Sequence, residues 1–223
     1  NVSFSLRAGE VLGIYGLMGA GRTELFECLM GLHPNASGDI WLNDEKLSGS
    51  IDRRIKQGIM LIPEDRQREG LVPELSVADN MLLASLRNYL NTIYLSRGKE
   101  MSHVSRMVQE LSIKVPNVAN LISSLSGGNQ QKVVVAKSML TSPKVLLMDE
   151  PTRGIDVGAH AEIINIIKRL AADGKAMLII SSELAEIVDY SDRVVVLRDH
   201  KKTMELVGEQ ISENNIMQAI AER

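Results

Sequence analysis

The stretch Gly16-Leu17-Met18-Gly19-Ala20-Gly21-Arg22-Thr23 decides the fold of this chain. An apolar run at residues 11–15 precedes it and predicts a buried strand, and residues 24–30 follow as a helix that Gly31 ends. A strand, a glycine turn and a helix in this order make a phosphate-binding loop credible. The glycines let backbone N–H groups surround an anion, and the helix N-terminus adds positive potential.

The loop departs from the pattern G-x-x-x-x-G-K-[ST] at one position, because Arg22 stands in place of lysine. Thr23 stands where a hydroxyl would reach a Mg²⁺ ion. A tight turn that binds nothing is the alternative for the loop taken alone. A dinucleotide site is less favoured, since the glycines run G-x-x-G-x-G and no clear ribose-binding acid follows at the expected place.

Composition limits the classes of partner. The 223 residues carry a net charge of −3 with both signs mixed and no long block of Lys or Arg, which does not favour nucleic acid. A single Cys28 excludes an intrachain disulfide and fits a reducing compartment. No apolar run approaches the ~20 residues of a membrane span, so any link to a membrane must go through a partner. The chain starts on Asn1 without an initiator Met, which suggests a fragment of a longer polypeptide.

Strand and helix patterns alternate at both ends of the chain, whereas the middle is helical. Strands are predicted over residues 2–6, 39–43, 58–63, 144–151, 176–180, 193–197 and 203–207. Helices are predicted over residues 51–57, 76–86, 100–111, 130–140, 159–170, 183–188 and 212–221, with Ser76, Ser102 and Ser212 as N-caps. We therefore expect one α/β domain over residues 1–223, with a helical subdomain at about 74–140 inserted in its core.

Two acids end the most apolar of these strands. Such strands are typical of parallel sheets covered on both faces, and open α/β sheets bind ligands at the carboxyl ends of their strands. Asp149 can hold the shell of a Mg²⁺ ion there, and Glu150 can face an attacking water. The alternative is that both acids cap the next helix.

Three other stretches are less specific. Gly127 and Gly128, at a predicted helix start, can present backbone N–H groups to an anion, although Ser126 can also be an ordinary N-cap. The charged residues 64–70 are predicted to be a solvated connection. Trp41 invites a base-stacking hypothesis, but a packing role is favoured for one aromatic on a short strand.

The order of the motifs is more specific than any one of them. A phosphate loop, a helical insert, Leu-Ser-Gly-Gly and an apolar strand ending in Asp-Glu-Pro resemble the ATP-binding-cassette ATPases over essentially the whole chain. Residues 16–24, 63–66 and 149–159 look like the C-terminal cassette of bacterial monosaccharide importers of the ribose, galactose and xylose type. This resemblance implies a P-loop NTPase fold, with a mostly parallel sheet and antiparallel strands at the N-terminal side.

The resemblance also implies roles for individual residues. Two cassettes of such proteins bind two ATP molecules between them. Each ATP lies between the phosphate loop of one cassette and the signature of the other, which corresponds to residues 125–131 here. Thr23 and Asp149 would order Mg²⁺, and Glu150 would polarise water. The implied nucleotide-binding residues are Gly16, Leu17, Met18, Gly19, Ala20, Gly21, Arg22, Thr23, Glu24, Glu64 and Ser182 for this chain's own site, and Ser126, Gly127, Gly128 and Asp156 for the interface with the partner cassette.

Three of these residues depart from the family pattern. Arg22 replaces the loop lysine, Glu64 replaces a glutamine, and Ser182 replaces a histidine. Losing one electrostatic contact of this kind commonly costs ~2.7–4 kcal/mol. The signature at residues 125–131 is intact, so we predict that this half has an impaired site of its own and completes a competent site in a partner.

The implied partners are an N-terminal cassette of the same polypeptide, an integral membrane permease and, indirectly, an extracytoplasmic solute-binding protein. The implied location is the cytoplasmic face of the bacterial inner membrane, as a peripheral subunit. One alternative is a soluble cassette ATPase of DNA repair or translation, although the coiled-coil insertion or basic extension usual there is absent. A second alternative, which the degenerate loop favours for this fragment, is a regulatory module that binds nucleotide without hydrolysis.

Overall fold

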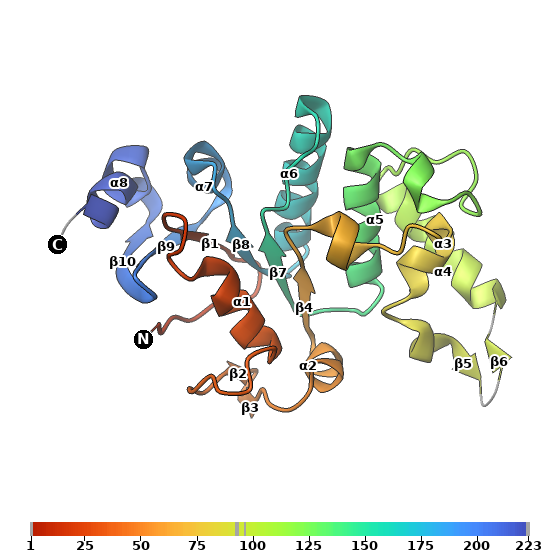
Figure 1. Cartoon of the computed structure of the whole chain (residues 1–223), viewed down its shortest axis with the longest axis horizontal. Coiled ribbons are helices and arrows are strands. Elements are labelled where there is room, and N and C mark those ends of the chain that lie inside the picture. The colour runs from red at the N-terminus through yellow and green to blue at the C-terminus, as the bar shows by residue number, and fades with distance from the viewer. Residues whose placement is uncertain (1, 92–93, 96, 222–223) are drawn as a thin grey trace. The chain divides into compact units, whose positions relative to one another are not determined.

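A computed structural model describes residues 2–91, 94–95 and 97–221 of the chain. The chain divides into two compact units, and Figure 1 gives the labels of their elements. The first, here called the sheet unit, comprises Asn1–Leu61, Lys144–Pro151 and Ile167–Arg223. The second, the helical unit, comprises Ile62–Pro143 and Thr152–Ile166. The single domain and its subdomain at about 74–140 stay a prediction.

The sheet unit is built on a six-stranded sheet in the order β10-β9-β1-β8-β7-β4. β1 pairs in parallel with β8 and β9, β7 pairs in parallel with β8, and β10 runs antiparallel to β9. The bounds are Val11–Tyr15 for β1, Ile59–Ile62 for β4, Val145–Asp149 for β7, Ala176–Ile180 for β8, Arg193–Arg198 for β9 and Lys201–Val207 for β10. The predicted α/β fold with a mostly parallel sheet is confirmed.

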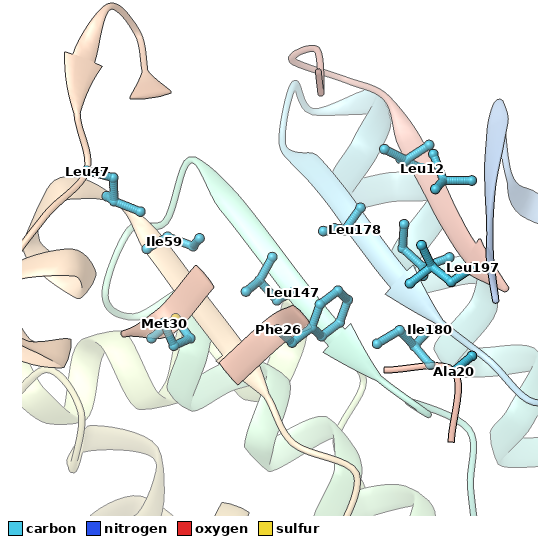
Figure 2. Packing of buried hydrophobic residues seen from close by; sticks show 12 residues of the cluster. Leu12, Ala20, Phe26, Met30, Leu47, Ile59, Leu147, Leu178, Ile180 and Leu197 are labelled. Atoms are coloured by element: carbon cyan, nitrogen blue, oxygen red, sulfur yellow. The ribbon is translucent and has the colours of Figure 1, made fainter. Parts of the chain in front are cut away.

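Helices and a small hairpin complete the sheet unit. The helices are α1 (Arg22–Met30), α2 (Ile51–Gln57), α7 (Leu184–Tyr190) and α8 (Glu213–Ala221), and β2 (Trp41–Leu42) pairs with β3 (Glu45–Lys46). Phe26 of α1 is fully buried, and Figure 2 shows its ring among Leu147 and Ile180 of the sheet. This packing fixes the start of α1, and with it the loop that leaves β1.

The helical unit contains α3 (Val77–Leu82), α4 (Arg97–Glu110), α5 (Gly127–Met139) and the first part of α6 (Val157–Ala172). α3 contacts both α4 and α5. β5 (Leu90–Asn91) pairs with β6 (Tyr94–Leu95). The sequence also indicates a turn between the predicted helices, over residues 91–98, and part of this stretch lies outside the described residues. No helix in the described part of the chain combines the length and the apolarity that crossing a membrane requires.

The structure corrects several local predictions. Residues 2–6 form no strand, although Phe4 packs against the core from its extended segment. Ser102 lies inside α4 because that helix begins at Arg97, whereas Ser76 does cap α3 through a 3.0 Å bond from the Asp79 N–H. Trp41 is 62% exposed, so the favoured packing role was wrong.

Two further corrections lie beside the candidate site. The predicted connection at residues 64–70 contains a π-helical turn over Arg66–Gly70, because the Asp65 side chain accepts from two backbone N–H groups at its start. α5 begins at Gly127, three residues earlier than predicted. The glycines of the signature are therefore the first residues of the helix.

Candidate functional site

The glycine loop between β1 and α1 needs its glycines for close approach. A Cβ on Gly16 would lie 2.5 Å from the Leu197 carbonyl oxygen, and one on Gly21 would lie 2.4 Å from Nδ1 of His200. Gly21 also has a φ of 89°, which a side chain disfavours. The tip of the loop is open, since Met18 is 98% exposed. The loop is therefore held close to neighbouring residues at Gly16 and Gly21 while its tip stays open to solvent.

Asp149 ends β7 as a buried acid with one unsatisfied oxygen. It is 2% exposed, and its Oδ1 has no hydrogen-bond partner. Burial is the main cause that raises its pKa to about 6, the charge of Glu150 adds to the rise, and a hydrogen bond with Thr23 and the charge of Arg22 oppose it. A buried carboxylate oxygen beside a hydroxyl fits one face of a Mg²⁺ ion that takes its other ligands from phosphate and water. Among the described residues no cluster of three His, Cys, Asp or Glu could hold a metal by itself.

Glu150 is held by other residues of the sheet unit. Its Oε2 accepts from the backbone N–H of Ser182 at 2.9 Å and from the Ser182 hydroxyl at 3.0 Å. Its Oε1 lies 3.6 Å from Nη1 of Arg22, which also donates to the Ser181 carbonyl at 3.2 Å. Glu150 has a φ of 47°, a conformation that non-glycine residues rarely adopt. Both carboxylate oxygens are therefore engaged within the chain.

In the helical unit the signature glycines allow two backbones to meet. A Cβ on Gly128 would lie 2.2 Å from Cβ of Ala159, and one on Gly127 would lie 2.9 Å from Nη2 of Arg66. Ser126 is the N-cap residue of α5 and makes no side-chain capping bond to the helix backbone. The start of α5 therefore packs against the start of α6, and Ser126 stays exposed.

The loop before α6 is fixed by its own side chains and by Arg66. Asp156 accepts from the Ala159 N–H at 3.0 Å, and this bond is the main cause that lowers the Asp156 pKa. Arg66 donates to the carbonyls of Arg153 at 2.7 Å and of Gly154 at 2.8 Å. Glu64, which the sequence predicts beside ATP, forms an ion pair with Arg153.

The predicted site residues thus fall into two groups. The sheet unit brings together residues 16–24 with Asp149, Glu150 and Ser182, and the helical unit carries Glu64, Ser126, Gly127, Gly128 and Asp156. Sequence reasoning assigned no role to Arg66, Asn129 or Lys132. Lys132 is 1% exposed, and its Nζ donates to the Ser112 carbonyl at 2.9 Å and pairs with Glu162 at 2.5 Å. The sequence feature that could have drawn attention to Lys132 is its charge directly before the apolar residues 133–136 of the same helix.

The family model of ABC transporters matches residues 1–153, and the chain belongs to this family. The chain is 47% identical over 218 residues to a ribose import ATP-binding protein of Rhodopirellula baltica, covering 96% of this chain and 42% of that protein. It is 46% identical over 219 residues to a xylose import ATP-binding protein of Moorella thermoacetica, covering 97% and 43%. The chain thus spans less than half the length of these relatives.

The fold is similar to that of solved ATP-binding cassettes. A nucleotide-free ATP-binding cassette from an ABC transporter superposes with a TM-score of 0.82 at 22% identity, covering 99% of this chain and 88% of that one. At this level of identity the likeness concerns the fold. It agrees with the mixed, mostly parallel sheet and the helices described above.

Proposed function

We propose that this chain is the nucleotide-binding domain of an ABC importer ATPase that drives uptake of a monosaccharide or a related small solute. The support is the similarity to ribose and xylose import ATP-binding proteins at 41–47% identity. We further propose that the chain corresponds to the C-terminal cassette of such a protein and works with an N-terminal cassette of the same polypeptide. This follows the motifs at residues 16–24 and 149–159 and the share of the relatives that the chain spans.

The sheet unit would hold MgATP at its glycine loop. Backbone N–H groups of residues 16–23 would surround the phosphates, and Thr23 with Asp149 would hold Mg²⁺, which when bound neutralises phosphate charge. Two observations favour this: the unpaired Asp149 Oδ1 and the close approaches that only glycine allows at Gly16 and Gly21.

The observation that carries the division of labour is the state of Glu150. A glutamate that activates water must accept a hydrogen bond from it, and in Glu150 one oxygen already accepts two bonds from Ser182 while the other pairs with Arg22 at 3.6 Å, so a water would compete with both partners. Arg22 would have to leave the same pair and the Ser181 carbonyl to make a phosphate contact through Nη1. We therefore propose that the chain's own pocket binds ATP but hydrolyses it slowly, while Ser126, Gly127 and Gly128 complete a competent site on the partner cassette.

The remaining partners follow from the import assignment. An integral membrane permease would dock at the helical unit near Glu64, and an extracytoplasmic binding protein would deliver the solute. The subunit would lie at the cytoplasmic face of the bacterial inner membrane as a peripheral protein. Specificity for the sugar would reside in the permease and the binding protein.

The test compares two substitutions in the full-length polypeptide assembled with its permease. Ser126→Arg, which fills the signature, is expected to lower ATP turnover by at least ~100-fold, in the range of a lost oxyanion-type donor. Thr23→Ala, which weakens the chain's own pocket, is expected to lower turnover far less. Ser123→Arg, at an exposed serine of the same segment, is the matched control. Turnover that survives Ser126→Arg and is abolished by Thr23→Ala would refute the division of labour.

A second candidate, a regulatory module that binds nucleotide without hydrolysis, is favoured by the same engagement of Glu150. The two proposals differ in the full-length protein. A regulatory module predicts MgATP binding with no turnover that depends on Ser126.

A further inference from the structure

The side chain of Asn129 is fixed in one orientation by the backbone. The N–H of Lys114 donates to Asn129 Oδ1 at 2.8 Å. A backbone N–H can only donate, so the oxygen of the amide must face it. The NH₂ group of Asn129 consequently points the other way, toward Ser126.

This orientation fixes the direction of the next hydrogen bond. Asn129 Nδ2 lies 2.9 Å from Ser126 Oγ. An amide NH₂ has no acceptor capacity, so Ser126 must accept this bond through a lone pair. The hydroxyl hydrogen of Ser126 is therefore left for another acceptor, and within the described residues none is recorded for it.

The segment that sets this orientation is itself held by a buried cation. Lys132, on the same helix as Asn129, donates to the Ser112 carbonyl at 2.9 Å, two residues before Lys114. Glu162 lies 2.5 Å from Lys132 Nζ and 3.7 Å from Lys114 Nζ. The Lys114 N–H is thus kept in place by contacts from α5 and α6.

We propose that Asn129 is a positioning residue that makes the signature serine a hydrogen-bond donor. The series runs from the Lys114 N–H to the Asn129 amide, from the amide to Ser126 Oγ, and from the Ser126 O–H outward to a phosphate oxygen of a nucleotide bound by the partner cassette. The proposal rests on the proposed function of the signature. It deepens that function by naming the residue that sets the direction of the serine hydrogen.

The direction matters because phosphate oxygens only accept. If Ser126 instead donated to the residue at position 129, it would present lone pairs to an anion and repel it. Asn129→Asp makes this reversal with almost no change in shape. The Lys114 N–H can still donate to one carboxylate oxygen, but the other oxygen must now accept from Ser126.

The experiment is a double-mutant cycle in the full-length polypeptide with its permease, measured as MgATP turnover. Ser126→Ala and Asn129→Asp are each expected to lower turnover by at least about 10-fold, toward the 10²–10³-fold range of a lost oxyanion-type donor. In the Ser126→Ala background, Asn129→Asp is expected to cost less than about 2-fold more, because the residue acts only through the serine. Asn120→Asp adds the same charge at an exposed turn of the helical unit and is the matched control.

Each outcome separates the two proposals. Losses that multiply in the double variant would mean that Asn129 acts by structure or charge alone, and would overturn the positioning role. A loss with Ser126→Ala but none with Asn129→Asp would overturn it while the proposed function stands. No loss with Ser126→Ala would overturn the proposed function and, with it, this inference.

Discussion

The pocket of the sheet unit and the signature of the helical unit use their polar groups in opposite ways. In the sheet unit, Ser182 donates two hydrogen bonds to one oxygen of Glu150, and Arg22 pairs with the other oxygen at 3.6 Å. In the signature, Asn129 donates to Ser126 Oγ, so the Ser126 hydroxyl hydrogen is not used in that bond. A group already paired within the chain must break those bonds before it can act on a ligand, whereas a fixed donor needs no rearrangement.

Burial makes this difference larger. The side chains of Arg22 and Glu150 are 16% and 8% exposed. At such exposure a charge pair is only weakly screened by water and salt, and removing one partner leaves an uncompensated charge. Ser126, in contrast, is exposed, and its bond from Asn129 is neutral. The comparison teaches that the intact signature stands where its serine is oriented for a ligand, whereas the altered glycine loop stands where its charged groups pair with each other.

The largest expected effect is at the signature. Gly128→Ala would place a Cβ 2.2 Å from Cβ of Ala159 and so force apart the starts of α5 and α6. We expect turnover of the full-length polypeptide to fall at least ~100-fold, because the displaced N–H groups and Ser126 are the anion donors of the proposed site. Overpacking should also cost about 1–3 kcal/mol of stability.

Gly98→Ala is the matched control for this substitution. Gly98 lies in α4 with no neighbour within 4 Å of its added Cβ, so alanine there should leave turnover unchanged and favour the helix. Equal turnover in the two alanine variants would contradict the prediction, since the signature would then not need the close packing of Gly128 against Ala159.

Much of the sheet unit could be predicted because its signals are local. Residues 11–15 and 176–180 are continuous apolar runs, and both are buried parallel strands. The exposure of Trp41 could not be predicted from the sequence, because exposure depends on which other elements pack on a strand and not on the strand itself. The π-helical turn at Arg66–Gly70 was missed for a related reason, since its charged sequence has no apolar period to read.

The candidate site divides in the same way. Glycines and acids at fixed spacing predict a site at residues 16–23 and Asp149, because those motifs are contiguous in sequence. The contacts Arg22–Glu150 and Lys114–Asn129 join distant positions, and no spacing rule in a single sequence predicts them. Substitution of the loop lysine was visible in the sequence, but the partner that Arg22 takes was not.

The next prediction tests the self-paired pocket directly. Arg22→Lys replaces the planar guanidinium with a compact ammonium, which suits a point contact to phosphate. The substitution also removes the guanidinium that pairs with Glu150. We expect the chain to bind MgATP about 10-fold more tightly, which is about 1.4 kcal/mol, as measured by calorimetry. Arg53→Lys, at an exposed arginine of the same unit, is the control. Unchanged or weaker binding in Arg22→Lys would show that the ion pair does not limit the pocket.

A smaller effect is expected from the second partner of Glu150. Ser182→Ala removes the hydroxyl bond at 3.0 Å but keeps the backbone N–H bond at 2.9 Å. The free energy of unfolding should fall by about 1 kcal/mol, the net worth of one hydrogen bond. Urea denaturation checks this, with Ser3→Ala at an exposed position as the control. A loss no greater than that of the control would mean that the Ser182 hydroxyl contributes nothing to holding Glu150 beyond the backbone N–H bond.

The smallest effect concerns the anchor beneath the signature. The hydrogen bond and charge of Lys132 lower the pKa of Glu162 below its ordinary value. The stability from this pair is therefore fully present above the unfolded pKa of about 4.3 and is lost as the pH falls through the lower folded pKa. Since the Glu162 side chain is 44% exposed, solvent screening limits the contribution to about 0.5 kcal/mol.

Glu162→Gln isolates this contribution from the rest of the acid response. The variant should melt slightly below the unsubstituted chain at pH 7. The two melting temperatures should converge as the pH falls below the lowered folded pKa of Glu162, because the carboxylate of the parent is then protonated in both states. Glu110→Gln, which removes an equal charge from the exposed pair with Arg106, should give no such convergence beyond the error of the measurement. Parallel curves for Glu162→Gln and its parent would mean that Lys132 holds the Ser112 segment through its carbonyl bond alone, and that the signature is anchored without the charge of α6.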